Sequence, residues 1–166
     1  MGLKFLCILL MLMMLTGCGS QPVYETVQDP WIEVAAPCRE ITLKLPMEAA
    51  APVLQSPEEG KLYLCDGYVL TVQTFGGGDL DETLRQLTGF NKEQLTYMQT
   101  QSGDLKRYAC VWSAAGEGGD HVGRAVILDD GSYHYAVSVM ADFATAGDLA
   151  DTWQELLSTV KVTDID

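Results

Sequence analysis

The sequence predicts an α+β fold in which two helices cover an antiparallel β-sheet. Two Asp-Gly pairs, at 66–67 and 130–131, each stand between runs rich in β-branched and aromatic residues, which is the pattern of β-hairpins. Two other segments, 79–89 and 145–160, repeat apolar residues with a helical period. Hairpins that dominate over regular strand–helix alternation are typical of α+β proteins.

The first predicted elements lie between residues 38 and 75. Apolar and polar residues alternate over 39–45, which predicts a half-buried strand that Pro46 ends. Residues 47–60 are predicted to be a loop, because their prolines and glycine prevent a long helix. Residues 61–75 then form a hairpin with a predicted type I′ turn. A two-residue turn places five residues on one face: Tyr63, Cys65, Tyr68, Leu70 and Val72.

A helix is predicted over residues 79–89. Asp79 is the expected N-cap, and Glu82 three residues later completes a pattern like a capping box. Gly89 is expected to end the helix in the left-handed conformation. The apolar side of this helix consists of Leu80, Leu84 and Leu87.

Four strands are predicted to follow. Residues 93–114 form two strands around a turn at 102–104, and a flexible connection over 115–120 leads to a hairpin over 121–142. In the second strand, Tyr108, Cys110 and Trp112 share one face. The last hairpin places Val126, Leu128, Tyr133, Tyr135, Val137 and Val139 on one face. His134 falls on the opposite face, near Ile127.

The C-terminal segment predicts a helix that runs into a short strand. Thr145 or Asp148 is the expected cap, and Val160-Lys161-Val162 returns to strand character. The apolar side of the helix consists of Leu149, Trp153, Leu156, Leu157 and Val160.

The N-terminus has the pattern of an export signal. Lys4 precedes an uncharged apolar run of 11 residues, Phe5 to Leu15. Such a run is the length of a signal-peptide core and is too short to span a bilayer, which requires about 20 apolar residues. The motif Leu15-Thr16-Gly17-Cys18 then resembles the lipobox of bacterial lipoproteins. The resemblance implies cleavage between Gly17 and Cys18 and a diacylglyceryl group, with acyl chains such as palmitate, on the Cys18 thiol.

This resemblance implies three regions: a signal peptide at 1–17, a lipidated N-terminus and tether at 18–37, and a single domain at 38–166. The domain is then expected on the extracytoplasmic face of a cell membrane, held by acyl chains that each contribute about 0.8 kcal/mol per buried methylene. An aspartate directly after the lipidated cysteine would resemble an inner-membrane retention signal, and none follows Cys18. In a host with two membranes, the outer membrane is therefore a possible location.

The charge of the processed chain excludes one class of partner. Beyond position 17 the chain has 9 Lys and Arg against 23 Asp and Glu, a net charge of −14. A basic patch suited to nucleic acid is not visible, so nucleic acid is not an expected partner.

Three cysteines remain after Cys7 is removed and Cys18 is acylated, namely Cys38, Cys65 and Cys110. If the strand over 39–45 pairs with the first strand of the 61–75 hairpin, Cys38 approaches Cys65, and a disulfide between them is predicted. Such a bond closes a loop of about 26 residues and stabilises the fold by roughly 3 kcal/mol. A bond between Cys65 and Cys110 is the alternative.

Several runs of the chain resemble the latter half of the Mog1/PsbP-like fold, and the resemblance covers residues 38–163. The resemblance rests on the runs YMQTQSGDLKRYACVW and GRAVILDDGSYHYAVSVMA, followed by a terminal helix that runs into Ser158-Thr159-Val160-Lys161. The family includes photosynthetic accessory proteins and bacterial lipoproteins and shares no catalytic residue. The resemblance therefore implies a non-enzymatic interaction or accessory module with an unknown protein partner.

No catalytic set, metal site or cofactor site is predicted. His134 is a conceivable base for Cys110, and Glu117, Asp120 and His121 form a loose acidic group, but a core thiol and a solvated hairpin explain these residues more simply. The alternative function is binding of a small molecule or peptide at the seam between sheet and helix. The candidate lining of that groove is Trp112, Tyr133, Tyr135 and Trp153, with Tyr97 beside them.

Overall fold

The computed structural model describes residues 39–49, 51–56, 60–116 and 118–165. The chain divides into two compact units, 1–33 and 34–166, and the described residues all belong to the second. The predicted signal peptide, Cys18, the tether and Cys38 lie outside the described residues. In the part that is described, no helix has the length and apolar character needed to cross a membrane.

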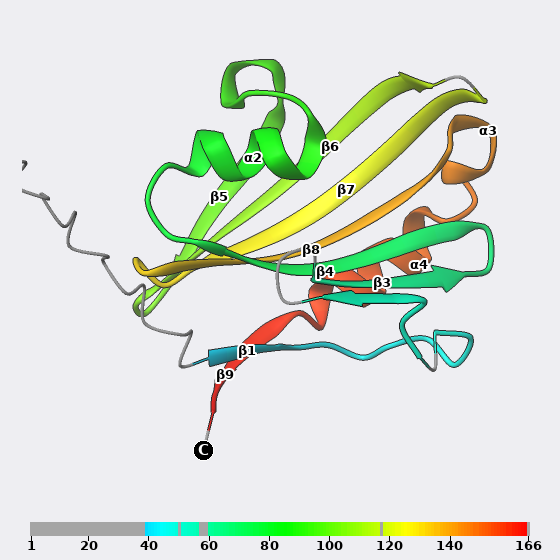
Figure 1. Ribbon diagram of the computed structural model, residues 1–166. Coiled ribbons are helices and arrows are strands. Elements are labelled where there is room, and N and C mark those ends of the chain that lie inside the picture. Colours follow the sequence, from blue (N-terminus) through cyan, green and yellow to red (C-terminus); the bar gives the residue numbers. More distant parts are fainter. Residues whose placement is uncertain (1–38, 50, 57–59, 117, 166) are drawn as a thin grey trace, which may run out of the picture. The chain divides into compact units, whose positions relative to one another are not determined.

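A seven-stranded antiparallel sheet forms the centre of the second unit, in the order β2-β3-β4-β8-β7-β6-β5 (Figure 1). Its strands are β2 (Leu54–Ser56), β3 (Gly60–Cys65), β4 (Tyr68–Gly76), β5 (Thr96–Ser102), β6 (Leu105–Gly116), β7 (Gly119–Asp129) and β8 (Tyr133–Asp142). A separate antiparallel pair joins β1 (Arg39–Thr42) to β9 (Lys161–Asp164). The helical elements are α2 (Leu80–Thr88), η1 (Lys92–Gln94), α3 (Phe143–Ala146) and α4 (Ala150–Ser158). The α+β class is confirmed.

The three predicted hairpins form. Cys65 pairs with Tyr68, which is the predicted register. Ser102 pairs with Leu105 at the end of β5, whereas the prediction placed it in the turn, and in the last hairpin Asp129 pairs with His134 around the predicted turn at 130–131. The prediction of a type I′ turn at 66–67 is wrong, however. Gly67 has φ +79° while no residue other than glycine has a positive φ in the described chain. A type I′ turn requires positive φ at both central residues, and a negative value followed by a positive one is the pattern of a type II turn.

Two of the predicted connections contain strands. Residues 47–60 include β2, whose three residues are too short to show a periodicity in the sequence. The flexible connection at 115–120 is instead the end of a long hairpin, in which Gly116 of β6 pairs with Gly119 of β7. Glycines in this stretch hid the strands, because glycine has low strand propensity.

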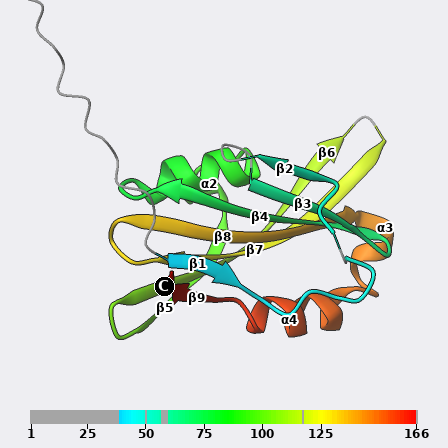
Figure 2. The same cartoon turned by 60° about the horizontal axis from the view of Figure 1, so that its bottom comes forward.

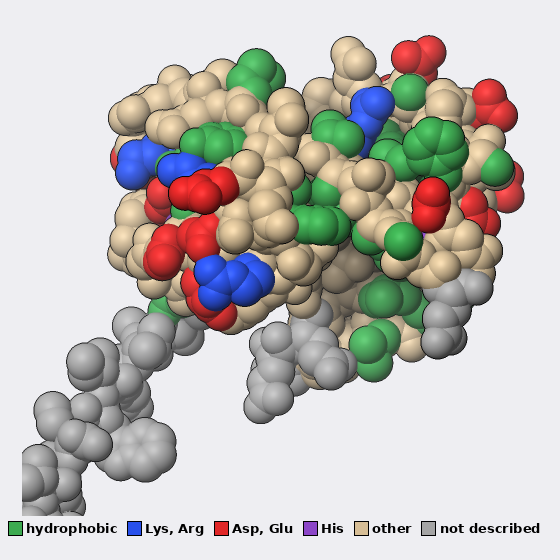
Figure 3. Space-filling view, turned by 90° about the horizontal axis from the view of Figure 1, so that it is seen from above, with side chains coloured by type: hydrophobic (Ala, Val, Ile, Leu, Met, Phe, Trp, Pro, Cys, Tyr) green, Lys and Arg blue, Asp and Glu red, His purple; other side chains and the backbone are tan. Residues whose placement is uncertain are grey.

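Helix α2 has the predicted ends but lacks the predicted capping box. The Asp79 carboxylate accepts a hydrogen bond of 2.9 Å from the Asp81 N–H, and Gly89 ends the helix with φ +81°. Glu82 accepts hydrogen bonds from Arg85 and Gln86 further along the helix. Figure 3 shows the face of the molecule on the side of α2, where acidic and basic side chains lie next to one another.

The predicted C-terminal helix is divided in two. After α3 the chain bends at Gly147, and α4 begins beyond Leu149 without a side-chain cap. Neither Thr145 nor Asp148 caps it: the Thr145 hydroxyl donates to the carbonyl of Asp142 instead. The sheet is therefore covered by α2 on one face and by α4 on the other, with α3 as a short addition (Figure 1).

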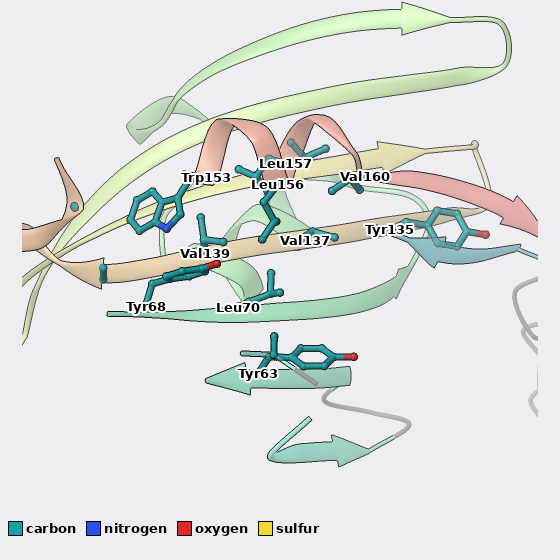
Figure 4. Close-up of a cluster of buried hydrophobic side chains, with 14 of the residues drawn as sticks. Tyr63, Tyr68, Leu70, Tyr135, Val137, Val139, Trp153, Leu156, Leu157 and Val160 are labelled. Atoms are coloured by element: carbon teal, nitrogen blue, oxygen red, sulfur yellow. The ribbon is translucent and has the colours of Figure 1, made fainter. Parts of the chain in front are cut away.

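A hydrophobic core lies on each face of the sheet. On the α4 face, Trp153 and Leu156 extend from the helix toward β8 and β4 (Figure 4), and Leu157 belongs to the same core. The buried strand residues of this core are Tyr63, Tyr68, Leu70, Val126, Leu128, Tyr135, Val137, Val139 and Ala141. On the α2 face, Leu84 forms one core cluster with Tyr108, Cys110, Trp112, Ala125, Ile127 and Ala136. The predicted faces of both hairpins and of β6 are confirmed.

The β1–β9 pair removes the condition on which the predicted Cys38–Cys65 disulfide depended, namely that the first strand pairs with the 61–75 hairpin. Ile41 of β1 pairs with Val162 of β9 on the α4 side of the sheet (Figure 2). The Arg39 guanidinium lies 2.9 Å from Asp164, 3.1 Å from Asp104 and 3.8 Å from Asp130. These contacts hold the pair against the β5–β6 and β7–β8 turns, which no local sequence pattern could show.

Candidate functional site

The four aromatic residues predicted to line a groove do not lie together. Tyr135 and Trp153 are fully buried in the core on the α4 face, where Tyr133 packs at the edge. Trp112 belongs to the core on the opposite face, under α2. Their role is packing, because no surface reaches the two fully buried rings.

A groove does lie at the seam between helix and sheet. Of the predicted residues only Tyr97 borders it, and the Tyr97 ring packs on the opposite face beside Tyr108. The groove has a volume of about 490 Å³ and runs between α4 and strands β5, β6 and β7. We call it the α4 groove. Its apolar lining includes Met98, Ala109, Val111, Val126 and Leu157, its polar uncharged lining includes Thr96, Gln154 and Ser158, and its charged lining is Arg107 and Arg124.

The groove exists because α4 covers only part of its face of the sheet. The helix packs over β8 and its neighbours, and its core includes no residue of β5. Met98 on β5 and Val111 on β6 are consequently 64% and 47% exposed. The sheet continues beyond the helix, and its uncovered strands form the floor of the groove.

Both arginines of the groove are fixed by the backbone of α4. The Arg107 guanidinium donates to the carbonyls of Leu157 and Val160, at 2.7 Å and 3.3 Å, near the C-terminal end of the helix. The Arg124 guanidinium donates to the carbonyl of Ala150 at 3.4 Å, at the N-terminal end. Each guanidinium has five N–H groups, so both retain donors beyond these bonds.

Neither arginine forms an ion pair with a described carboxylate. The other two described arginines, Arg39 and Arg85, are both paired with Asp or Glu. No acidic residue lines the groove. Burial lowers the pKa of Arg107 from its ordinary value, because desolvation disfavours the charged form. An arginine stays protonated at neutral pH nevertheless, so the groove holds two positive charges that have no carboxylate partner among the described residues.

Arg124 also shows an unused donor. Its guanidinium carbon lies 5.9 Å from the centre of the Trp153 ring, in cation–π geometry. Its Nε is buried and has no hydrogen-bond partner among the described residues. The indole therefore positions this guanidinium without neutralising its charge.

Sequence reasoning missed both arginines, although a signal was present for one. Strand alternation places Arg124 on the same face as Val126 and Leu128, which was the strongest predicted core face. A charge on a face predicted to be buried is unusual and identifies a candidate site. Arg107 gave no such signal, because it alternated with aromatic residues as a solvent-facing residue does.

A buried chain of polar groups lies on the α2 face. The Thr83 hydroxyl and His134 Nδ1 are 2.6 Å apart, and His134 Nε2 lies 3.8 Å from Asp129. The order hydroxyl, imidazole, carboxylate is that of a nucleophile, base and acid. Thr83 and His134 are only 3% and 1% exposed, however, and lie under α2, where a substrate has no access.

The structure does not bring His134 to Cys110. Cys110 pairs with Ala125 on β7, whereas His134 pairs with Asp129, four residues or about 13 Å further along that strand. Burial raises the pKa of the Cys110 thiol to about 11. A thiol with this pKa is a poor nucleophile at neutral pH.

The burial of His134 makes stability depend on pH. Its pKa is lowered chiefly by desolvation, with Lys106 acting in the same direction against Asp129, Asp130 and Asp79. The unfolded chain therefore binds the proton more readily, and the free energy of unfolding should fall as the pH drops below about 6.5. Urea denaturation measures the free energy of unfolding at pH 7.5 and at acidic pH, and the decrease between the two should be smaller for His134→Gln than for the wild type. The matched control His121→Gln should retain the wild-type fall, and an equal fall in His134→Gln would contradict this account.

The cysteines and the acidic group also have clear positions. Cys65 and Cys110 are free thiols on opposite faces of the sheet, so the alternative disulfide between them is wrong. Because β1 pairs with β9, the argument for a disulfide between Cys38 and Cys65 no longer holds. Cys38 lies outside the described residues, so that disulfide stays a prediction.

Among the described residues, the acidic group around His121 does not form a metal site. His121 lies 3.0 Å from Asp142, and Glu117 is not described. Within the described ranges, no three His, Cys, Asp or Glu side chains gather as a metal site.

Comparison with known proteins identifies no family. No family model matches the sequence, and no curated protein matches it. Among solved structures, the chain is similar to LpqN, a protein involved in cell envelope biogenesis of Mycobacterium tuberculosis. The two are 11% identical, with a TM-score of 0.49, and the match covers 75% of this chain and 84% of LpqN. A similarity at this level supports no inference about this chain, so membership of the Mog1/PsbP-like fold stays a prediction.

Proposed function

We propose that the chain is a lipid-anchored, non-enzymatic binding module that holds an anionic ligand in the α4 groove. The observation that carries this proposal is the pair Arg107 and Arg124. Both line an apolar groove, and neither has a described carboxylate partner, in a chain with a net charge of −13. In a protein with so many acidic residues, two arginines without a carboxylate partner indicate a place where a ligand supplies the negative charge.

The lining defines the chemistry of the ligand. Hydrogen bonds between guanidinium and carboxylate are charge-assisted and are strengthened where water is partly excluded. The apolar floor of the groove favours a ligand with a hydrocarbon part. A carboxylate on an aliphatic chain combines both features. An acidic side chain of a partner protein presents the same chemistry, which links the groove to the predicted interaction role.

Substitution of the arginines tests the proposal. Decanoate should bind to the purified domain, and the double variant Arg107→Gln/Arg124→Gln should weaken that binding by about tenfold or more, since a hydrogen bond to a charged group contributes roughly 1.5–3 kcal/mol. Isothermal titration calorimetry measures the affinity directly. Arg85→Gln is the matched control, because Arg85 is exposed on α2 and paired with Asp81 and Glu82.

The design separates binding from folding. Val111→Glu places a carboxylate directly opposite Arg124 on the neighbouring strand, at a position that is already exposed. It should weaken decanoate binding without lowering the melting temperature by more than a few degrees. If the wild type binds no carboxylate ligand, or if the double variant and Val111→Glu both bind decanoate as well as the wild type does, the proposal is wrong.

The membrane anchor is an independent part of the proposal, supported by the lipobox-like motif. Cys18 is proposed to carry a diacylglyceryl group at the mature N-terminus. Cys18→Ser should shift the full-length protein from the membrane fraction to the soluble fraction or leave it unprocessed, because serine cannot form the thioether. Mass spectrometry of the purified N-terminus should find the acyl mass on Cys18. An unmodified Cys18 in membrane-associated protein would refute the anchor.

The non-enzymatic role rests on the inaccessibility of the candidate nucleophiles. Thr83 of α2 and His134 beneath it are buried on the face of the sheet opposite α4. Cys110 borders the floor of the α4 groove, but it belongs to the α2-face core and is only 3% exposed. Turnover in a broad hydrolase screen that is abolished by Cys110→Ala or His134→Ala would overturn this part of the proposal.

A further inference from the structure

The two arginines of the α4 groove are held at opposite ends of one short helix. Arg124 is bonded to the carbonyl of Ala150, and Arg107 is bonded to that of Leu157. These carbonyls are seven residues apart, which corresponds to about 10 Å along a helix. The strand register gives a similar separation of the two arginines. Arg124 pairs with Val111, and Val111 lies four residues, or about 13 Å, from Arg107 along β6.

The floor of the groove between the two guanidiniums is apolar, while Gln154 of α4 adds one uncharged polar side chain to the wall. Ala109 and Val126 lie on the floor between them, and Leu157 contributes from the helix. No described carboxylate lines this stretch. The groove therefore has a positive charge at each end and hydrocarbon contacts in the middle.

From this arrangement we infer that the ligand is a dianion whose two acidic groups are separated by about 10–13 Å of apolar chain. The inference rests on the proposed function and adds the number and spacing of the charges. Carboxylates match the fork geometry of the guanidinium, so a long-chain α,ω-dicarboxylate is the simplest ligand of this class. Two glutamates in an extended segment of a partner protein, four residues apart and thus about 13 Å apart on one face, present the same chemistry.

A series of dicarboxylates tests the spacing. The carboxylates of extended sebacate are about 11 Å apart, at roughly 1.2 Å of advance per bond. Sebacate should bind about tenfold or more tightly than decanoate, which has the same chain length and one carboxylate. Succinate is too short to reach both arginines and should bind no better than decanoate. An extended peptide with glutamates at its first and fifth positions and valines between them distinguishes a protein segment from a free diacid as the tighter ligand.

Single substitutions test whether the tighter binding of sebacate depends on the arginines at the two ends of the groove. Arg107→Gln and Arg124→Gln should each remove the advantage of sebacate over decanoate, while Arg85→Gln should leave it unchanged. Arg107→Lys retains the charge and should keep part of the advantage, which excludes loss of folding as the cause. If decanoate and sebacate bind equally to the wild type, the dianion inference is wrong although an anion still binds in the groove. If neither ligand nor the peptide binds, the inference and the proposed function both fail.

Discussion

Trp153→Ala is expected to lower the free energy of unfolding by about 3–5 kcal/mol, the range for removal of a large aromatic side chain from a core. Trp153 is fully buried on α4, and its ring meets that of Tyr68 edge to face at a centroid distance of 6.2 Å. The truncation leaves a cavity between α4 and the sheet, because the remaining side chains of a packed core relax only partly. Urea denaturation followed by circular dichroism measures the loss.

Two further variants identify the cause of that loss. The Trp153 Nε1 is buried and has no hydrogen-bond partner among the described residues, so Trp153→Phe removes an unpaired donor and should cost less than Trp153→Ala. Glu155→Ala, on the exposed side of the same helix, should change stability by no more than about 0.5 kcal/mol. A loss below about 1 kcal/mol for Trp153→Ala would contradict the described packing of α4.

Trp153→Ala should also weaken ligand binding. The indole supports the Arg124 guanidinium from one side, at 5.9 Å from its carbon atom. Without the ring this guanidinium is free to move, and its bond to Ala150 loses support. Under conditions where the variant is folded, decanoate affinity should therefore fall, although Trp153 is not expected to touch the ligand.

Leu84→Ala is expected to lower the free energy of unfolding by about 2–5 kcal/mol. Leu84 is the fully buried leucine of α2 and belongs to the α2-face core together with six other buried residues. Helix α2 has only 9 residues, and an isolated helix of that length is unstable in water, so its packing on the sheet provides most of its stability. Removal of this contact should therefore detach the helix.

The experiment for Leu84 again has an internal control. Gln86→Ala, two residues further and exposed, should change the free energy of unfolding by less than about 0.5 kcal/mol. Because α2 and the α4 groove lie on opposite faces of the sheet, folded Leu84→Ala should keep its affinity for decanoate. A loss of affinity in the folded variant would show that the two faces are coupled.

The sequence predicted the features whose causes are local. Asp-Gly pairs and Gly103 located the turns, and Asp79 and Gly89 located the ends of α2. Period-two alternation assigned the strand faces correctly, because successive side chains of a strand point to opposite sides. The lipobox-like motif lies outside the described residues, so its prediction rests on the sequence alone.

Only the tertiary structure decided which distant segments meet. β1 joins β9 across more than a hundred residues, and β4 pairs with β8 at the centre of the sheet. Neither pairing has a local signal, because each strand offers the same backbone groups to any neighbour. The α4 groove has the same origin. Arg107 and Arg124 are 17 residues apart on neighbouring strands and become one site only where the carbonyls at the two ends of α4 hold their guanidiniums.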